Sequence, residues 1–138
     1  FFLDQRDLEN AEDWIGRASA LVPDSEYSAW SPSLRHAIDR LSLQHGEFED
    51  LASRLAPRLH DIRSGGSVRN RLGELSTFAL ALAELARTDE ARAILDEIIP
   101  ELNRVRGSFS GDYPTEVAAR ALTRLGEADR ANSIARAH

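Results

Sequence analysis

Residues 72–105, LGELSTFALALAELARTDEARAILDEIIPELNRV, contain two amphipathic segments separated by a short polar connection at 87–90. Apolar side chains recur every three or four residues in both segments, at Leu72, Leu75, Ala79, Leu82 and Ala86, and then at Ala91, Leu95, Ile98, Leu102 and Val105. This spacing gathers the apolar side chains on one face of an α-helix. The stretch therefore predicts a helix hairpin, and the hairpin decides the fold class.

The same periodicity extends over most of the chain, and we expect about seven helices. The expected ranges are 4–22, 31–45, 47–63, 72–86, 88–105, 114–125 and 127–138. No stretch alternates between apolar and polar residues over more than a few positions, so no strand is predicted. We therefore predict one all-α domain over residues 1–138.

Local signals predict where these helices start, stop and bend. Thr88 is expected to cap the helix that follows it, with two acidic residues in the first turn. Gly46 suits the left-handed turn that ends a helix. Pro57 and Pro100 fall inside helical patterns, so we expect Pro57 to kink or interrupt its helix and Pro100 to bend its helix or end it early.

An offset of 40 residues reveals an internal repeat. It aligns three columns of small or apolar residues with one turn column, namely Ala11/Leu51/Ala91/Ala131, Ile15/Leu55/Leu95/Ala135, Leu8/Phe48/Thr88/Ala128 and Arg6/Gly46/Ala86/Gly126. Each unit is a helix pair that cannot bury both faces alone, so stacked pairs would share a core. The approximate units are 1–30, 31–66, 67–111 and 112–138.

The motif within these units resembles the tetratricopeptide repeat (TPR). The resemblance rests on Leu82, Ala86, Ala91 and Leu95 in one unit, and on Ala119, Leu122, Gly126 and Ala131 in the next. Units of 40 residues exceed the family's 34, and such longer units resemble the sensor regions of MalT-like bacterial regulators. The resemblance implies a TPR-like α-solenoid of antiparallel helix hairpins.

Composition narrows the classes of function. A net charge of −6 argues against a nucleic-acid-binding domain, and no apolar run reaches the length of a membrane span. The chain has no Cys and no Met, so thiolate metal sites are excluded and we expect a processed chain or a fragment. All 17 basic residues are Arg, which fits either a preference for bidentate carboxylate contacts or the codon bias of a GC-rich genome.

No motif in the sequence assembles catalytic or metal-binding chemistry. The four His residues lack the i, i+4 spacing of a helical metal site. Residues 64–67 precede a helix that carries Arg69 and Arg71, so they are either an anion site or a plain linker. We expect no catalytic residue, no metal and no cofactor.

The TPR resemblance implies that the first helix of each pair lines a concave binding face. The candidate binding residues on this face are His36, Arg40, Gln44, Arg69, Tyr113, Arg120 and Arg124, with Glu74, Thr77 and Glu116 as further surface positions. Arg40, Arg120 and Arg124 would form a positive groove for an acidic peptide or a C-terminal carboxylate. The alternative is ordinary surface Arg in i, i+4 pairs, such as Glu116 with Arg120.

These observations favour a non-enzymatic, cytoplasmic protein-interaction module that binds a peptide or partner helix. The alternative is a self-assembling or regulatory segment of a larger bacterial regulator, because the chain would start on an unpaired helix with an apolar flank. A third reading is an enzyme with a small-molecule site among the helices. Neither nucleic acid nor membrane is expected as a partner.

Overall fold

The computed structural model describes residues 32–65, 67–105 and 113–136, and this part of the chain is helical with no strands. The helices are α2 (Pro32–Gln44), α3 (Phe48–Leu55), α4 (Leu59–Ser64), α5 (Val68–Glu84), α6 (Thr88–Arg104), α7 (Tyr113–Arg124) and α8 (Ala128–Arg136), with the 3-10 turn η2 (Ala56–Arg58) between α3 and α4. If α3, η2 and α4 are counted as one interrupted helix, the described residues form six helices instead of the expected seven. The expected helix at 4–22, and with it the unit 1–30, lies outside the described residues.

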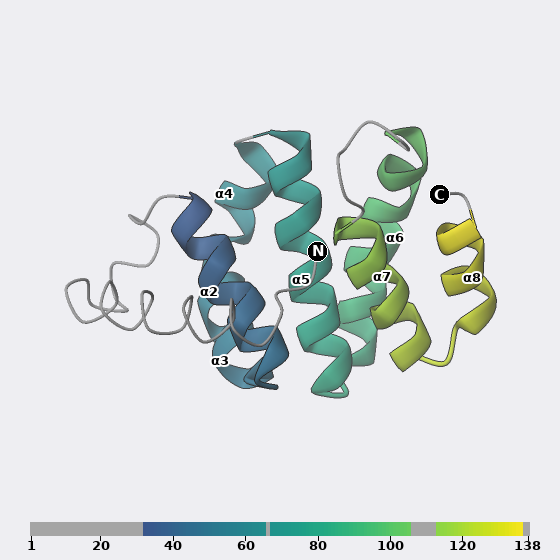
Figure 1. Ribbon diagram of the computed structural model, residues 1–138, viewed down its shortest axis with the longest axis horizontal. Helices are drawn as coiled ribbons and strands as arrows, with labels where there is room; N and C mark the ends of the chain where they lie inside the picture. The colour runs from purple at the N-terminus through teal and green to yellow at the C-terminus, as the bar shows by residue number, and fades with distance from the viewer. Residues whose placement is uncertain (1–31, 66, 106–112, 137–138) are drawn as a thin grey trace, which may run out of the picture.

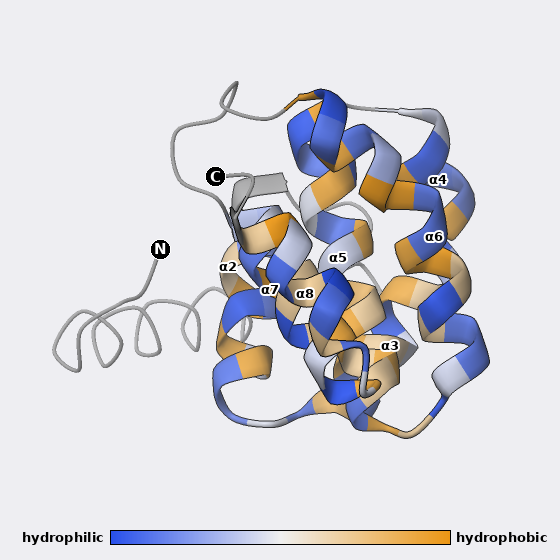
Figure 2. Ribbon diagram, turned by 90° about the vertical axis from the view of Figure 1, so that its right-hand side faces the viewer, coloured by the Kyte–Doolittle hydropathy of each residue, from blue (hydrophilic) through white to orange (hydrophobic). Residues whose placement is uncertain are grey.

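Helix α5 is the centre of the molecule. It contacts α2, α3, α4, α6 and α7, and every residue from Glu74 to Ala83 is buried. A helix surrounded by neighbours needs small or apolar side chains on all sides, and the run FALALA at 78–83 provides them. Figure 2 shows α2 and α7 on one side of the molecule and α4 and α6 on the other, and Figure 1 shows α5 between them. The predicted all-α fold is therefore confirmed, with α5 as its core helix.

Three turns recur at intervals of 40 residues with the same backbone geometry. Gly46, Ala86 and Gly126 have φ angles of 72°, 61° and 81°, the left-handed conformation. The following residue closes each turn through its N–H, which donates to the carbonyl five positions back: Glu47 to Ser42, Arg87 to Leu82 and Glu127 to Leu122. These are the bonds of a Schellman-type helix end. The left-handed turn expected at Gly46 is confirmed.

The two internal prolines have different effects. Pro57 interrupts its helix as expected, because the chain forms the 3-10 turn Ala56–Arg58 between α3 and α4. Pro100 does not end its helix, since α6 continues through it to Arg104. Pro100 and Asp96 are both exposed. Pro100 has no N–H to donate to the carbonyl of Asp96, four positions back, and water can reach this carbonyl instead.

The helix predicted to follow residues 64–67 and to carry Arg69 and Arg71 is α5. It begins at Val68, because Ser67 serves as its N-cap and the Ser67 hydroxyl accepts a hydrogen bond from the Asn70 N–H at 3.1 Å. One predicted helix start was wrong. Thr88 does not cap α6: it is the first helical residue, and the cap position belongs to Arg87 without a side-chain cap bond. The helix follows the left-handed turn at Ala86 immediately, and its first backbone hydrogen bond runs from the Ala91 N–H to the Arg87 carbonyl.

Within the described residues, no helix is long and apolar enough to cross a membrane.

Candidate functional site

A narrow pocket lies where α2, α5 and α7 meet, and it collects four of the seven candidate binding residues. His36 and Arg40 come from α2, Arg69 from the first turn of α5, and Tyr113 from the start of α7. The pocket volume is about 50 Å³. Small-molecule sites usually enclose roughly 300–1,000 Å³, so this space fits a single small polar group instead of a complete metabolite.

Gly73 keeps one side of this pocket open. Glycine within a helix lowers its stability relative to alanine, so its presence there calls for a reason. A Cβ at Gly73 would meet no atom within 4 Å, so packing does not demand a glycine here. The missing side chain instead leaves room in the pocket that Gly73 helps to line.

Arg40, Tyr113 and Thr77 tie the three helices together inside the pocket. The guanidinium of Arg40 lies over the Tyr113 ring, 4.3 Å from its centroid, a cation–π arrangement. The Tyr113 hydroxyl shares a hydrogen bond of 2.9 Å with Thr77 Oγ1. Burial raises the pKa of Tyr113 above its ordinary value of 10.0, although the bond to Thr77 and the charge of Arg40 act in the opposite direction. The tyrosine therefore stays neutral at physiological pH. Because the Thr77 hydroxyl donates to the Gly73 carbonyl at 2.8 Å, the Tyr113 hydroxyl is the donor to Thr77.

A buried carboxylate, Glu74, lines both this pocket and a neighbouring one of about 110 Å³ that Arg58 of η2 also lines. Its Oε1 lies 3.2 Å from His36 Nε2, 3.3 Å from Arg58 Nη1 and 3.8 Å from Arg35 Nε. Burial alone would raise the pKa of Glu74. The bond with His36 and the charges of Arg58, His36 and Arg35 outweigh burial, so the pKa lies below its ordinary value of 4.5. Glu74 is therefore negatively charged at physiological pH and orients the cations around it.

The second buried carboxylate, Asp39, is held in a similar way. Arg54 Nη2 of α3 donates to Asp39 Oδ1 at 3.4 Å and to Ser42 Oγ at 2.6 Å. Asp39 and Ser42 are only 3% and 5% exposed. The contact between α2 and α3 is thus partly polar, next to the pocket that Asp39 also lines.

Sequence reasoning misplaced or missed several of these groups. Glu74 and Thr77 were predicted to lie on the surface, but they are 6% and 3% exposed because α2, η2 and α7 cover this side of α5. Arg35 and Arg58 were not singled out. Pro57 was the feature of the sequence that could have identified Arg58 as a buried residue. The 3-10 turn at Pro57 changes the direction of the Arg58 side chain, which points to the interior.

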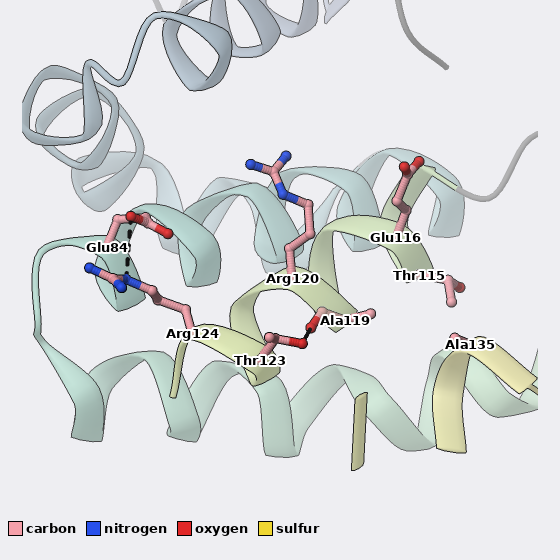
Figure 3. A pocket seen from close by; sticks show the side chains of 8 residues that line it. All are labelled: Glu84, Thr115, Glu116, Ala119, Arg120, Thr123, Arg124 and Ala135. Atoms are coloured by element: carbon pink, nitrogen blue, oxygen red, sulfur yellow. Dashed lines mark hydrogen bonds and ion pairs between the residues drawn. The ribbon is translucent and has the colours of Figure 1, made fainter. Parts of the chain in front are cut away.

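Arg120 and Arg124 lie in a different place. They line an open groove of about 880 Å³ between α7, the end of α5 and α8 (Figure 3). Arg124 Nε lies 3.4 Å from Glu84 Oε2, while the side chains of Arg120 and Glu116 extend from the same side of α7, apart from one another (Figure 3). The predicted single groove of Arg40, Arg120 and Arg124 is therefore divided between two sites.

Gln44 belongs to neither site. It is exposed at the last residue of α2 and lines neither the pocket nor the groove.

The region at 64–67 is used for backbone capping. The Ser64 hydroxyl donates to the His60 carbonyl at 2.7 Å, and the Ser67 hydroxyl accepts from the Asn70 N–H.

Among the described residues, no three His, Cys, Asp or Glu side chains lie close enough together to hold a metal ion. The groups that meet in the pocket are guanidinium, imidazole and hydroxyl groups, which donate hydrogen bonds, together with the carboxylates of Asp39 and Glu74, which are paired with Arg54 and Arg58. No family model, curated protein or solved structure matches the chain.

Proposed function

We propose that this chain is a non-enzymatic protein-interaction module, a cytoplasmic TPR-like array whose face formed by α2, α5 and α7 binds a peptide. The peptide places an acidic side chain or its C-terminal carboxylate in the pocket of His36, Arg40, Arg69 and Tyr113. Three helices contribute to this pocket, and their convergence on one small polar space is the observation that carries the proposal. A carboxylate there would meet the guanidinium groups of Arg40 and Arg69, which bind carboxylates strongly, while the carboxylates of Asp39 and Glu74 in the same lining are already paired with Arg54 and Arg58.

The size of the pocket supports a peptide over a free metabolite. A space of about 50 Å³ accepts one carboxylate, while the remainder of a peptide would run across the open surface of the three helices. The pairs formed by Glu74 and Asp39 hold the surrounding helices in place before binding. Such preorganisation lowers the entropy that binding costs.

The test uses a peptide array of matched pairs in which every Glu of one member is Gln in the other. We expect the wild-type protein to retain the Glu members and the Arg40→Gln/Arg69→Gln variant to bind them at least about tenfold more weakly, since charge-assisted bonds are lost. Arg63→Gln/Arg104→Gln is the control, because it removes the same charge from exposed positions in α4 and α6. Equal loss in both variants, or equal binding of Glu and Gln peptides, would refute the proposal.

Self-assembly within a larger bacterial regulator remains the second hypothesis. It was inferred from the helix expected at 4–22, which lies outside the described residues. Sedimentation velocity over a range of concentrations distinguishes it from the first, because only self-assembly makes the sedimentation coefficient rise with protein concentration.

A further inference from the structure

His36 is the one imidazole among the described side chains that line the pocket of α2, α5 and α7. Its side chain is 27% exposed, so protons from solvent reach it directly. The guanidinium groups of Arg40 and Arg69 stay charged throughout the physiological range. Glu74 and Tyr113 also keep their charge states, because the pKa of Glu74 lies below 4.5 and the pKa of Tyr113 above 10.0. Since imidazole is the side chain that responds to pH near neutrality, pH can act on the charge of the pocket through His36.

Glu74 determines which nitrogen of the His36 ring takes up a proton. His36 Nε2 lies 3.2 Å from Glu74 Oε1. An ionised carboxylate can only accept a hydrogen bond, so Nε2 carries a proton in both the neutral and the charged ring. Neutral His36 then has its lone pair on Nδ1, and protonation turns Nδ1 from an acceptor into a donor. Acidification therefore adds one positive charge and one hydrogen-bond donor to a side chain that lines the pocket.

The other charged or titratable groups around His36 come from several elements. In the two pockets that His36 lines, they are Arg35, Asp39 and Arg40 of α2, Arg58 of η2, Asp61 of α4, Arg69, Arg71 and Glu74 of α5, and Tyr113 of α7. Of the carboxylates, Glu74 is paired with Arg58 and Asp39 with Arg54. Because Nε2 donates to Glu74 in both states of the ring, a proton on Nδ1 requires no exchange of these partners. The added charge therefore makes the lining of the pocket more positive.

We propose that the pocket is pH-sensitive: protonation of His36 strengthens the binding of an acidic peptide, which is tighter at about pH 6 than at about pH 8. This inference rests on the proposed function and concerns the regulation of the same site. The added charge attracts a carboxylate in the pocket, and the carboxylate in turn favours the protonated ring, so binding takes up protons. One partly exposed ion pair corresponds to about a fivefold change in affinity.

The test repeats the matched-pair peptide array at about pH 6 and about pH 8, with peptides that contain no His. The Glu side chains of the peptides stay ionised over this range, so a change in retention reports on the protein. We expect wild-type protein to retain the Glu members about fivefold more strongly at the lower pH and the Gln members equally at both. In His36→Gln, which keeps a side-chain N–H for Glu74, this pH dependence should disappear, while binding at the higher pH remains.

His60→Gln is the matched control, because His60 is an exposed histidine of α4 that lines neither pocket. It should show the pH dependence of the wild type. Nitrogen NMR of the wild-type His36 ring gives a measurement that depends on no variant and on no peptide. The neutral ring should carry its proton on Nε2, and a neutral ring protonated on Nδ1 would overturn the inference.

The array separates a failure of this inference from a failure of the proposed function. Equal retention of the Glu members at both pH values by wild-type protein overturns the inference and leaves the proposed function intact. The inference is also overturned if His36→Gln keeps the pH dependence, if His60→Gln loses it, or if the Gln members show the same change. If no Glu member is retained over its Gln partner at either pH, the proposed function falls and the inference falls with it.

Discussion

Arg58 in η2 donates a hydrogen bond of 3.3 Å to the buried carboxylate of Glu74 in α5. The two side chains are only 8% and 7% exposed. The pair exists because Pro57 breaks the helix just before Arg58, and the 3-10 turn directs the guanidinium to the interior. By interrupting the helix, Pro57 thus makes possible a contact between Arg58 and Glu74, which are 16 residues apart in the sequence.

Removing this carboxylate should destabilise the fold. We expect Glu74→Leu to lower the free energy of unfolding by about 3 kcal/mol, because Arg58 is left buried beside an apolar group. Urea denaturation followed by circular dichroism measures the change. The control is Glu97→Gln, which breaks the exposed pair with Arg63 and should cost less than about 1 kcal/mol. Similar losses in both variants would contradict the role of burial.

The lowered pKa of Glu74 predicts a pH dependence of stability. A carboxyl group whose pKa is lower in the folded state stabilises the fold above its unfolded pKa of about 4.5, and this contribution disappears as the pH falls through the folded pKa. The difference in unfolding free energy between wild type and Glu74→Gln should therefore shrink as the pH falls below about 4.5. Urea titrations at several pH values measure it, and a difference that does not change with pH would contradict the assignment.

The recurring left-handed turn gives two substitutions with opposite effects. Ala86 has a φ of 61°, which strains an L-residue, so Ala86→Gly should stabilise the protein by up to about 1 kcal/mol. Gly126 has a φ of 81°, and Gly126→Ala should destabilise it by about 1 kcal/mol although nothing lies within 4 Å of the new Cβ. Thermal and urea unfolding of the two variants check both signs. Effects of the same sign would mean that the turns differ in solution.

Gly73 offers a test that separates stability from binding. Gly73→Ala should raise the free energy of unfolding by about 0.5–1 kcal/mol, because alanine favours the helix and its methyl group meets open space. The same methyl group narrows the pocket of about 50 Å³, so acidic peptides should bind more weakly. Denaturation and fluorescence anisotropy measure the two effects. A less stable protein would contradict the claim that the methyl group meets open space. Unchanged peptide affinity would contradict the claim that peptides bind in this pocket.

The sequence by itself determined the helices and the turns between them. A period of 3.6 residues is a local property, so the apolar stripes of residues 72–105 define two helices without any knowledge of their neighbours. The left-handed turns also follow from local chemistry, since Gly46 and Gly126 adopt a positive φ without steric cost. The proline at 57 was likewise a local signal.

Only the tertiary structure decided which polar residues are buried and which of them meet. Glu74 and Thr77 lie on the polar stripe of α5 but become buried, because a helix contacted by five others has no outward face for most of its length. The candidate arginines divide between the pocket and the groove for a related reason. Which arginines lie together depends on how α7 packs against α2 and α5. The periodicity of apolar residues along one helix gives no information about the distances between helices.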